Sequence, residues 1–216
     1  MAKTAVLIGA TGLVGNELLH KLLSSEHYSK VVTLSRRDLA ISHVKLVNHV
    51  IDFDKLTQYS ELIKGDVFFS CLGTTLKQAG SVAEQRKVDF DYQFIAAQLA
   101  ANNNIPHYCL VSSSGANAHS RSAYLKMKGA LEVQVKQLNF SKCSIFQPSL
   151  LLGERKQFRA AEKIGSYIFP VITMLPFLKR YKPITGKQVA QKMHAVSIEQ
   201  QAALSYYVLD ELFKYS

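Results

Sequence analysis

Two side chains capable of acid–base chemistry lie four residues apart on a predicted helix. Tyr124 and Lys128 fall within Ser122–Leu138, a stretch with a helical pattern, so both side chains project from the same face. A nearby ammonium group favours the phenolate form of a tyrosine. Tyr124 could therefore act as general acid or base on a hydroxyl or carbonyl group, while Lys128 also binds a cofactor ribose. Because this spacing also arises by chance, its position among the other motifs matters.

Hydroxyl groups are concentrated just after another predicted element. The serines of Ser112–Ser113–Ser114–Gly115 end the strand predicted over His107–Ser113. Open α/β sheets bind their ligands at the carboxyl ends of the strands, where a serine can hydrogen-bond a substrate oxygen. A serine-rich turn that caps the following segment is the alternative interpretation.

A glycine pattern near the N-terminus predicts a binding site for phosphate groups. Gly9, Gly12 and Gly15 connect the strand predicted over Thr4–Ala10 to a helix that begins near Leu13. Glycines there permit a tight turn, close approach of the backbone to a pyrophosphate, and close packing of the helix on the strand. The motif predicts dinucleotide binding, and a tight turn without a ligand is the alternative.

The end of the second predicted strand indicates which dinucleotide binds. Ser35–Arg36–Arg37 occupies the position where NAD-specific enzymes place a carboxylate for the adenosine ribose. A guanidinium group instead matches a 2′-phosphate through charge-assisted hydrogen bonds, so NADP(H) is favoured over NAD(H). Asp38 follows directly, and a small shift of the loop would bring its carboxylate to the ribose. A solvated charge cluster is the other alternative.

The segments that must position these residues alternate between strand and helix patterns. This alternation predicts an α/β protein with a doubly wound parallel sheet, the Rossmann fold, in one domain spanning residues 1–216. The predicted strands are Thr4–Ala10, Lys30–Arg36, Val44–Asp52, Val67–Gly73, His107–Ser113 and Cys143–Leu152. The predicted helices are one that begins at Leu13, Val88–Asn104 and Ser122–Leu138.

A different pattern follows Gly153. The stretch Ile164–Leu178 is strongly apolar, but Pro170 and Pro176 interrupt it and prevent one straight helix. We expect residues 153–185 to form a small helical or apolar lid or pocket wall on the substrate side. An ordinary helix pair that closes the core is the alternative.

Composition narrows the class of protein. With 48% hydrophobic and 19% charged residues, the chain matches a soluble globular enzyme and is too apolar for a disordered protein. The net charge of +10 is spread along the chain, which disfavours nucleic acid and leaves cofactor phosphates as a sufficient partner. The apolar run before Gly9 is too short for a signal peptide or a membrane span. We expect a cytoplasmic protein without disulfides or a zinc site, because no CxxC spacing joins Cys71, Cys109 and Cys143.

In their order along the chain, these motifs resemble the atypical short-chain dehydrogenases/reductases, and in detail the Tat-interacting-protein oxidoreductase branch of that family. The resemblance covers about Ala5–Leu152 well and the remainder weakly. The matching segments are Gly9–Gly15, Arg36–Arg37, Cys71–Thr75, Val88–Tyr92, Ser112–Ala116, Tyr124–Gly129 and Phe146–Pro148.

The resemblance implies a role for each motif. Tyr124 would be the catalytic acid/base, Lys128 its partner, and Ser113 the catalytic serine, with Ser112 and Ser114 as alternatives. Residues implied to bind NADP(H) are Gly9, Thr11, Gly12, Leu13, Val14 and Gly15 at the pyrophosphate, Ser35, Arg36 and Arg37 at the 2′-phosphate, Asp52 and Phe53 beside the adenine, Leu72, Gly73 and Thr74 from the fourth strand, and Lys128, Pro148 and Leu150 near the nicotinamide. No metal is implied.

Three departures from the family bear on function. Many relatives use an asparagine before the fifth strand to support a proton relay, whereas this chain offers Asp89 or Tyr92. Gln147 stands where relatives often have arginine, which removes one anchor for an acidic or phosphorylated substrate. The C-terminal third is short for a sugar-nucleotide epimerase, which argues against a large polar substrate.

The leading hypothesis is an NADPH-dependent oxidoreductase that acts on a small, apolar carbonyl or hydroxyl compound. One alternative is an NADPH-sensing regulatory protein without turnover, and another is an epimerase- or dehydratase-like enzyme. We expect a small-molecule substrate and leave open a protein partner and a homodimer.

Overall fold

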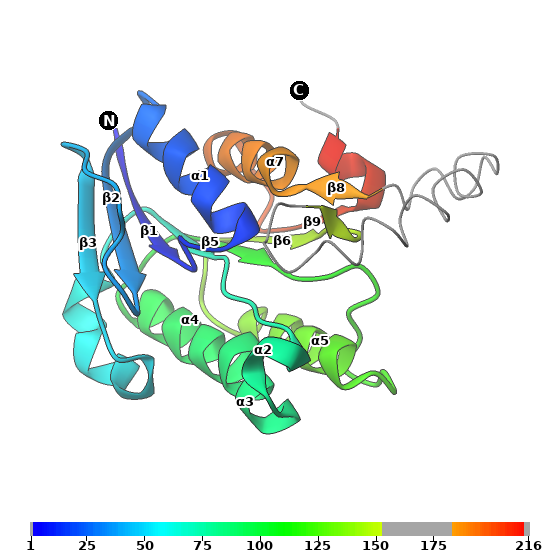
Figure 1. The fold of residues 1–216 in the computed structure, drawn as a ribbon. Coiled ribbons are helices and arrows are strands. Elements are labelled where there is room, and N and C mark those ends of the chain that lie inside the picture. Colours follow the sequence, from blue (N-terminus) through cyan, green and yellow to red (C-terminus); the bar gives the residue numbers. More distant parts are fainter. Residues whose placement is uncertain (1, 153–182, 214–216) are drawn as a thin grey trace.

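One sheet of seven parallel strands organises the part of the chain that the structure describes (Figure 1). The computed structural model describes residues 2–152 and 183–213. In their order across the sheet, the strands are β3 (Leu46–Val50), β2 (Tyr28–Ser35), β1 (Lys3–Ile8), β4 (Val67–Ser70), β5 (His107–Val111), β6 (Lys142–Gln147) and β9 (Leu204–Val208). Every neighbouring pair is parallel, so the predicted Rossmann fold is confirmed.

The strand order reverses between β1 and β4. From β1 the chain adds β2 and β3 on one side, then crosses over and adds β4, β5, β6 and β9 on the other. Gly9 follows β1 and Cys71 follows β4, and the Cys71 N–H donates to the Ile8 carbonyl at 3.0 Å. Open α/β folds bind ligands in the crevice at such a reversal point. The topology therefore predicts a ligand site at the carboxyl ends of β1 and β4.

Helices cover both faces of the sheet (Figure 1). On one face, α1 (Leu13–Ser24) packs beside α7 (Gly186–Glu199). The opposite face is covered by α4 (Tyr92–Asn102), α5 (Ala123–Val135) and the 3₁₀ segment η1 (Phe53–Leu62). A short 3₁₀ segment, η4 (Leu209–Phe213), follows β9. This two-faced cover buries every residue of the short central strand β4, as its continuous apolar sequence predicts.

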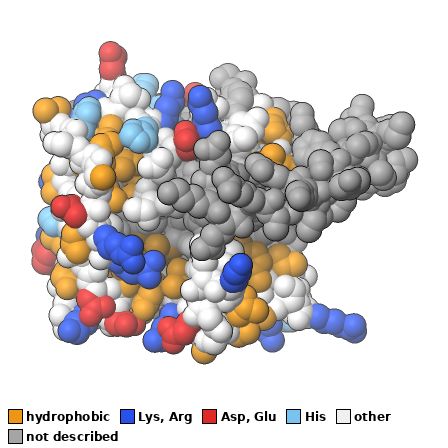
Figure 2. Space-filling view, in the orientation of Figure 1, with side chains coloured by type: hydrophobic (Ala, Val, Ile, Leu, Met, Phe, Trp, Pro, Cys, Tyr) orange, Lys and Arg blue, Asp and Glu red, His pale blue; other side chains and the backbone are white. Residues whose placement is uncertain are grey.

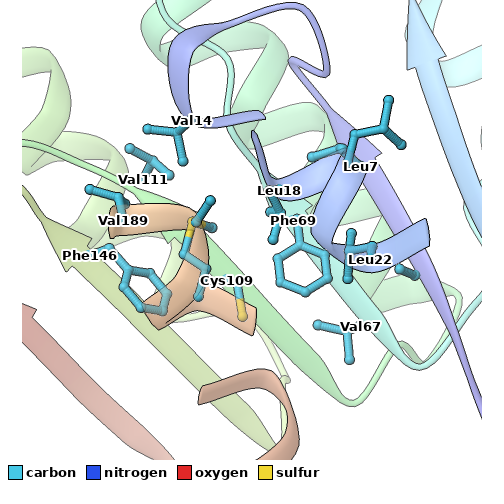
Figure 3. Packing of buried hydrophobic residues seen from close by; sticks show 14 of the residues in the cluster. Leu7, Val14, Leu18, Leu22, Val67, Phe69, Cys109, Val111, Phe146 and Val189 are labelled. Atoms are coloured by element: carbon cyan, nitrogen blue, oxygen red, sulfur yellow. The ribbon is translucent and has the colours of Figure 1, made fainter. Parts of the chain in front are cut away.

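The core beneath α1 and α7 is built from apolar side chains of both helices and of the central strands. Figure 3 shows Leu18 and Leu22 of α1 and Val189 of α7 around Phe69 and Cys109 of the sheet. Leu18 and Leu22 are fully buried, and burying a side chain of this size contributes about 1.5–3 kcal/mol. The helical spacing of the leucines thus fixes how α1, and the glycine loop before it, lies on the sheet.

The predicted helix Val88–Asn104 is present, but its first turn is a π-helical turn, η2 (Lys87–Asp91), which runs directly into α4. Two short helices that were not predicted, α2 (Leu76–Ala79) and α3 (Val82–Arg86), lead into this turn. The Ser81 hydroxyl caps α3 by accepting from the Glu84 N–H at 3.1 Å. A π turn widens the helix by one residue, which no simple periodicity predicts. At its centre, Asp89 is fully buried.

The predicted strand Cys143–Leu152 is divided in the structure. β6 ends at Gln147 because Pro148 has no N–H to offer a strand ladder. The chain then forms β7 (Leu151–Leu152), which pairs with β8 (Ile184–Thr185) in a separate two-stranded sheet. The prediction also missed β9 at the edge of the main sheet.

Most of the predicted lid, residues 153–185, lies outside the described residues, and only its last three belong to the described part. Within the described ranges, no helix has the length and apolar character needed to cross a membrane. The three cysteines are free thiols, with Cys109 and Cys143 buried and Cys71 partly exposed.

Charged side chains are mixed over the surface. Figure 2 shows Lys and Arg interspersed with Asp and Glu on the visible face, with apolar side chains between them. The positive charge of the chain is therefore distributed on this face and does not form one continuous basic surface.

A buried histidine in β5 predicts how stability depends on pH. The His107 Nε2 is hydrogen-bonded to the Ser144 hydroxyl at 2.7 Å, and the Ser144 hydroxyl contacts the Gln200 side-chain oxygen. Burial, with smaller effects of Lys142 and Lys3, lowers the pKa of His107 from 6.5 to about 4. Between these values the unfolded chain binds the proton more readily than the folded one. The stability that the folded state gains by burying a neutral His107 is therefore fully present above pH 6.5 and is lost as the pH falls toward 4.

The corresponding test is His107→Gln, with unfolding free energy measured by urea titration between pH 4 and 8. We expect the wild type to lose on the order of 3 kcal/mol more than the variant across this range. His119→Gln, at an exposed position, is the control and should keep the wild-type slope. An unchanged slope in His107→Gln would show that another group controls acid sensitivity.

Candidate functional site

A cleft of about 750 Å³ opens over the reversal point of the sheet. It is formed by the loops that follow β1, β4, β5 and β6 together with the start of α5. The lining residues are Gly12, Leu13, Val14, Cys71, Leu72, Gly73, Thr74, Thr75, Val111, Ser112, Ser113, Ser114, Gly115, Tyr124, Lys128, Pro148, Ser149, Leu150 and Leu151. The predicted catalytic residues and much of the predicted cofactor-binding set therefore meet in one place.

The glycine loop packs too closely for side chains at two positions. Gly9 has a φ of +83°, and a Cβ there would lie 2.4 Å from the Cys71 carbonyl carbon and oxygen. A Cβ on Gly15 would lie 2.1 Å from the Gly9 carbonyl oxygen. Both contacts hold the start of α1 against the ends of β1 and β4, which explains why these positions require glycine.

The N-terminus of α1 forms part of the cleft wall. Gly12 occupies the N-cap position, and no side-chain hydrogen bond caps the helix within the described ranges. The first N–H groups of a helix lack partners inside the helix and attract anions. Leu13 and Val14, in the first turn, line the cleft. From the other side, Gly186 of α7 packs so closely that a Cβ would lie 2.3 Å from the Leu13 carbonyl oxygen.

Tyr124 and Lys128 enter the cleft from the first two turns of α5. The Ser122 hydroxyl caps this helix by accepting from the Leu125 N–H at 3.5 Å. Tyr124 is half-buried, whereas Lys128 is almost fully buried and donates to the Val111 carbonyl at 3.3 Å. Gly129 lets the loop of residues 112–118, here called the serine loop, pack on α5, because a Cβ there would lie 2.3 Å from the Asn117 carbonyl carbon. The helix and the serine loop are thus held together.

The three candidate serines differ in their partners. Ser112 is buried, and its hydroxyl donates to the Glu132 carboxylate on α5. The Ser113 hydroxyl has only a long contact of 3.4 Å to the Ser114 carbonyl. The Ser114 N–H donates to the Pro148 carbonyl at 2.9 Å and joins the serine loop to the end of β6. Among the described contacts, the Ser113 hydroxyl is therefore freer than that of Ser112 to bind a ligand.

Arg36 and Arg37 are exposed directly after β2, outside the residues that line the cleft. Ser35 is buried, and its hydroxyl donates to the Arg37 carbonyl at 2.7 Å. The Asp38 carboxylate accepts from the Asn48 side-chain amide and from the Leu39 N–H, both at 3.0 Å. Ser35 therefore supports the arginine loop, and these two hydrogen bonds hold Asp38.

The remaining predicted cofactor-binding residues lie around the same edge of the sheet. Asp52 is exposed after β3 and caps η1 by accepting from the Asp54 N–H at 3.0 Å. Phe53 is buried, with its ring centroid 5.6 Å from that of Tyr92. Gly9, Thr11 and Gly15 also lie outside the lining set. Leu72, Gly73, Thr74, Pro148 and Leu150 are within it.

Two buried carboxylates stand behind the cleft. Asp89 lies 3.3 Å from the Lys128 ammonium and accepts from the Thr74 N–H at 3.1 Å. Burial raises the pKa of Asp89, and Lys128 and the Thr74 N–H oppose this shift. Burial also raises the pKa of Glu132, opposed by hydrogen bonds from Ser112 and Gln147. Neither carboxylate belongs to the predicted catalytic set. Asp89 is, however, one of the two residues that this chain offers in place of the relay asparagine of many relatives.

Tyr92 and Gln147 have partners that differ from those expected. The Tyr92 hydroxyl donates to Asp54 at 2.6 Å at an exposed position, so of the two relay candidates only Asp89 contacts Lys128. Gln147 donates to both Glu132 oxygens, at 2.9 and 3.1 Å, and does not line the cleft. In the described part of the chain, no three metal-binding side chains are grouped to hold an ion.

Two known proteins have sequences similar to most of this chain. No family model matches the chain. It is 37% identical to the protein HTATIP2 of Rattus norvegicus over 171 residues, which cover 77% of this chain and 70% of that protein. It is 39% identical to the protein FMP52, mitochondrial, of Candida albicans over 173 residues, which cover 74% and 75% of the two chains.

Solved structures with low sequence identity share the fold. The enzyme WbmH of Bordetella bronchiseptica, in complex with NAD⁺, has a TM-score of 0.73 at 14% identity, covering 96% of this chain and 76% of its own. MoeE5, in complex with UDP-glucuronic acid and NAD, has a TM-score of 0.71 at 14% identity, covering 95% and 76%.

Fold and sequence comparison together define a Rossmann-fold protein of the atypical short-chain dehydrogenase/reductase class. Within that class, the identity to HTATIP2 and FMP52 over most of the chain places this protein in their family.

Proposed function

We propose that the protein is an NADP(H)-dependent oxidoreductase that acts on a small, apolar carbonyl or hydroxyl compound. The observation that supports this most directly is the convergence of Tyr124, Lys128 and Ser113 on the cleft that the first turn of α1 also lines. An acid, a cation and a hydroxyl group next to a helix N-terminus are the parts that such chemistry needs.

The residues of the cleft fit a nicotinamide dinucleotide. Because Gly9 and Gly15 have no side chains, the N-terminus of α1 packs close to the edge of the sheet. This helix N-terminus has no side-chain cap, so its N–H groups can bind a pyrophosphate. Gly12, Leu13 and Val14 would hold that group, and Leu72, Gly73 and Pro148 would flank the rest of the molecule. When bound, the cofactor supplies or accepts a hydride at nicotinamide C4.

The proton chemistry follows from the chain's own side chains. In carbonyl reduction, Tyr124 would donate its phenolic proton to the substrate oxygen, and Ser113 would hydrogen-bond the same oxygen. The Lys128 ammonium would stabilise the phenolate that remains on Tyr124. In alcohol oxidation the same phenolate would accept the proton. Pro148, Leu150 and Leu151 give this part of the cleft an apolar wall, which suits an apolar substrate.

The preference for NADP(H) rests on the two exposed arginines after β2. We expect Arg36→Ala with Arg37→Ala to weaken NADPH binding roughly 100-fold, because two charge-assisted hydrogen bonds of about 1.5 kcal/mol each are lost. NADH affinity should change far less, since NADH lacks the 2′-phosphate. Titration followed by nicotinamide fluorescence measures both dissociation constants.

A matched control removes the same charge elsewhere. Lys30 and Lys126 are exposed and do not line the cleft, so Lys30→Ala with Lys126→Ala should leave NADPH affinity almost unchanged. Equal affinity of the wild type for NADPH and NADH would contradict the assignment of the arginines to a 2′-phosphate.

A screen of aldehydes, ketones and quinones with NADPH tests the oxidoreductase function itself. Oxidation of NADPH that requires both the protein and a carbonyl compound is the expected result. Tight NADPH binding without turnover on any compound would instead favour the sensor alternative. Tightly retained nicotinamide that is regenerated in place would favour an epimerase- or dehydratase-like reaction.

We propose the cytosol as the location, on the basis of the three free thiols. Since FMP52 relatives are named mitochondrial, fractionation of cells that produce the protein is the appropriate test.

A further inference from the structure

One buried aspartate contacts two parts of the cleft at once. Asp89 is fully buried in the π turn η2, and its Oδ1 lies 3.3 Å from the Lys128 Nζ. Its Oδ2 accepts from the Thr74 N–H at 3.1 Å. Lys128 and Thr74 both line the cleft, one from α5 and the other from the loop after β4. A single carboxylate therefore links the catalytic helix to the loop implied to bind the cofactor.

The ammonium group of Lys128 depends on this carboxylate. Lys128 is almost completely buried, so water provides little compensation for its charge. Asp89 is the acidic residue within ion-pair distance of Lys128 in the described ranges. Glu132, one turn further along α5, is bonded to Ser112 and Gln147. An asparagine at position 89 could keep the hydrogen bond to Thr74, but it would not neutralise the ammonium.

The remaining contacts fix the direction of the lysine. An ammonium group has three N–H donors. The Lys128 Nζ lies 3.3 Å from the Asp89 Oδ1 as an ion pair and donates to the Val111 carbonyl at 3.3 Å. Lys128 lines the cleft together with Tyr124. The loop after β4 also packs close to this carboxylate, because a Cβ on Gly73 would lie 3.6 Å from the Asp89 Oδ1.

We propose that Asp89 is a positioning residue that keeps Lys128 charged and fixed beneath the cleft and ties it to the loop at Thr74. This inference rests on the proposed function of the site. Asp89 acts through Lys128 and the Thr74 backbone.

The first test uses the protein without cofactor. Asp89→Asn and Lys128→Met are each expected to lower Tm by roughly 10 °C, because each leaves one buried charge without its partner. The double variant should recover most of that loss. Asp91→Asn is the matched control, since Asp91 lies in the same turn but is only partly buried and pairs with the exposed Arg86 at 3.5 Å. A double variant that loses as much as both single variants together would overturn the proposal. If one single variant fails to fold, a folded double variant supports the pair, whereas a double variant that also fails to fold overturns the proposal.

The second test measures NADPH affinity between pH 6 and pH 10. We expect Asp89→Asn to bind within about threefold of the wild type at pH 6, and to fall progressively further below the wild-type affinity as the pH is raised. A uniform loss at every pH would indicate a purely structural role and would overturn the proposal. If the wild type binds no NADPH, the proposed function fails, whereas the cofactor-free comparison still decides whether Asp89 and Lys128 act as a pair.

Discussion

Replacing Tyr124 with phenylalanine is expected to lower the rate of carbonyl reduction by about 10²–10⁴-fold, the usual effect of removing a general acid. The variant should still bind NADPH with nearly the wild-type affinity, because the glycine loop, the start of α1 and Lys128 are unchanged. Single-turnover oxidation of bound NADPH by a carbonyl compound that the wild type reduces measures the first quantity, and fluorescence titration measures the second.

The control for this substitution is Tyr206→Phe at the exposed edge of the sheet. Tyr206 lies on β9 and does not line the cleft, so both quantities should stay at their wild-type values. A Tyr124→Phe variant with full turnover would exclude the phenol as the proton donor. A variant that lost NADPH as well would assign Tyr124 to binding and leave the source of the proton open.

Adding one methyl group at Gly9 is expected to weaken NADPH binding roughly 100-fold, since a displaced loop would lose hydrogen bonds to the charged pyrophosphate that are worth about 1.5–3 kcal/mol each. The φ of +83° is strained for alanine, and the new Cβ would meet the Cys71 carbonyl at 2.4 Å. The contact involves main chain on both sides, so the loop after β1 must move away from the end of β4. Fluorescence titration and thermal unfolding would follow the two consequences.

Gly80 separates strain from collision. Its φ is +84°, but nothing lies within 4 Å of an added Cβ. Gly80→Ala should therefore cost only the strain of a left-handed residue, about 1–2 kcal/mol, and should leave NADPH binding intact. Similar losses of stability and binding in both variants would show that the close approach to Cys71 is not what requires glycine at position 9.

The central part of the fold follows directly from sequence patterns. The run Val67–Ser70 is apolar at nearly every position and forms a strand buried on both faces. The leucines of α1 recur with helical spacing and bury one stripe against the sheet. The glycines between β1 and α1 predict the turn that the structure shows there. Local chemistry determines each of these features, so a single sequence is enough to predict them.

The features that were missed depend on contacts between distant segments. Asp89 has no pattern that marks it as buried, because its place depends on a π turn and on Lys128 in a different helix. Gln147 stands where relatives often have arginine, which predicts an effect on substrate binding, but its side chain donates to Glu132 instead. β9 is short and lies at an edge, where burial leaves little periodic signal. In each case the tertiary partner, and not the local sequence, determines the role.

The close contact between Gly186 and Leu13 has a consequence for how the protein matures during synthesis. Gly186 opens α7, and its backbone packs against the first turn of α1, at the point where the phosphate groups would bind. A ribosome makes the glycine loop first, and Gly186, which packs against it, is added only after the whole of the sheet up to β6 has been made. The nucleotide should thus bind chains that have been extended past α7 in preference to shorter nascent ones, and a supply of NADPH would stabilise those longer chains selectively.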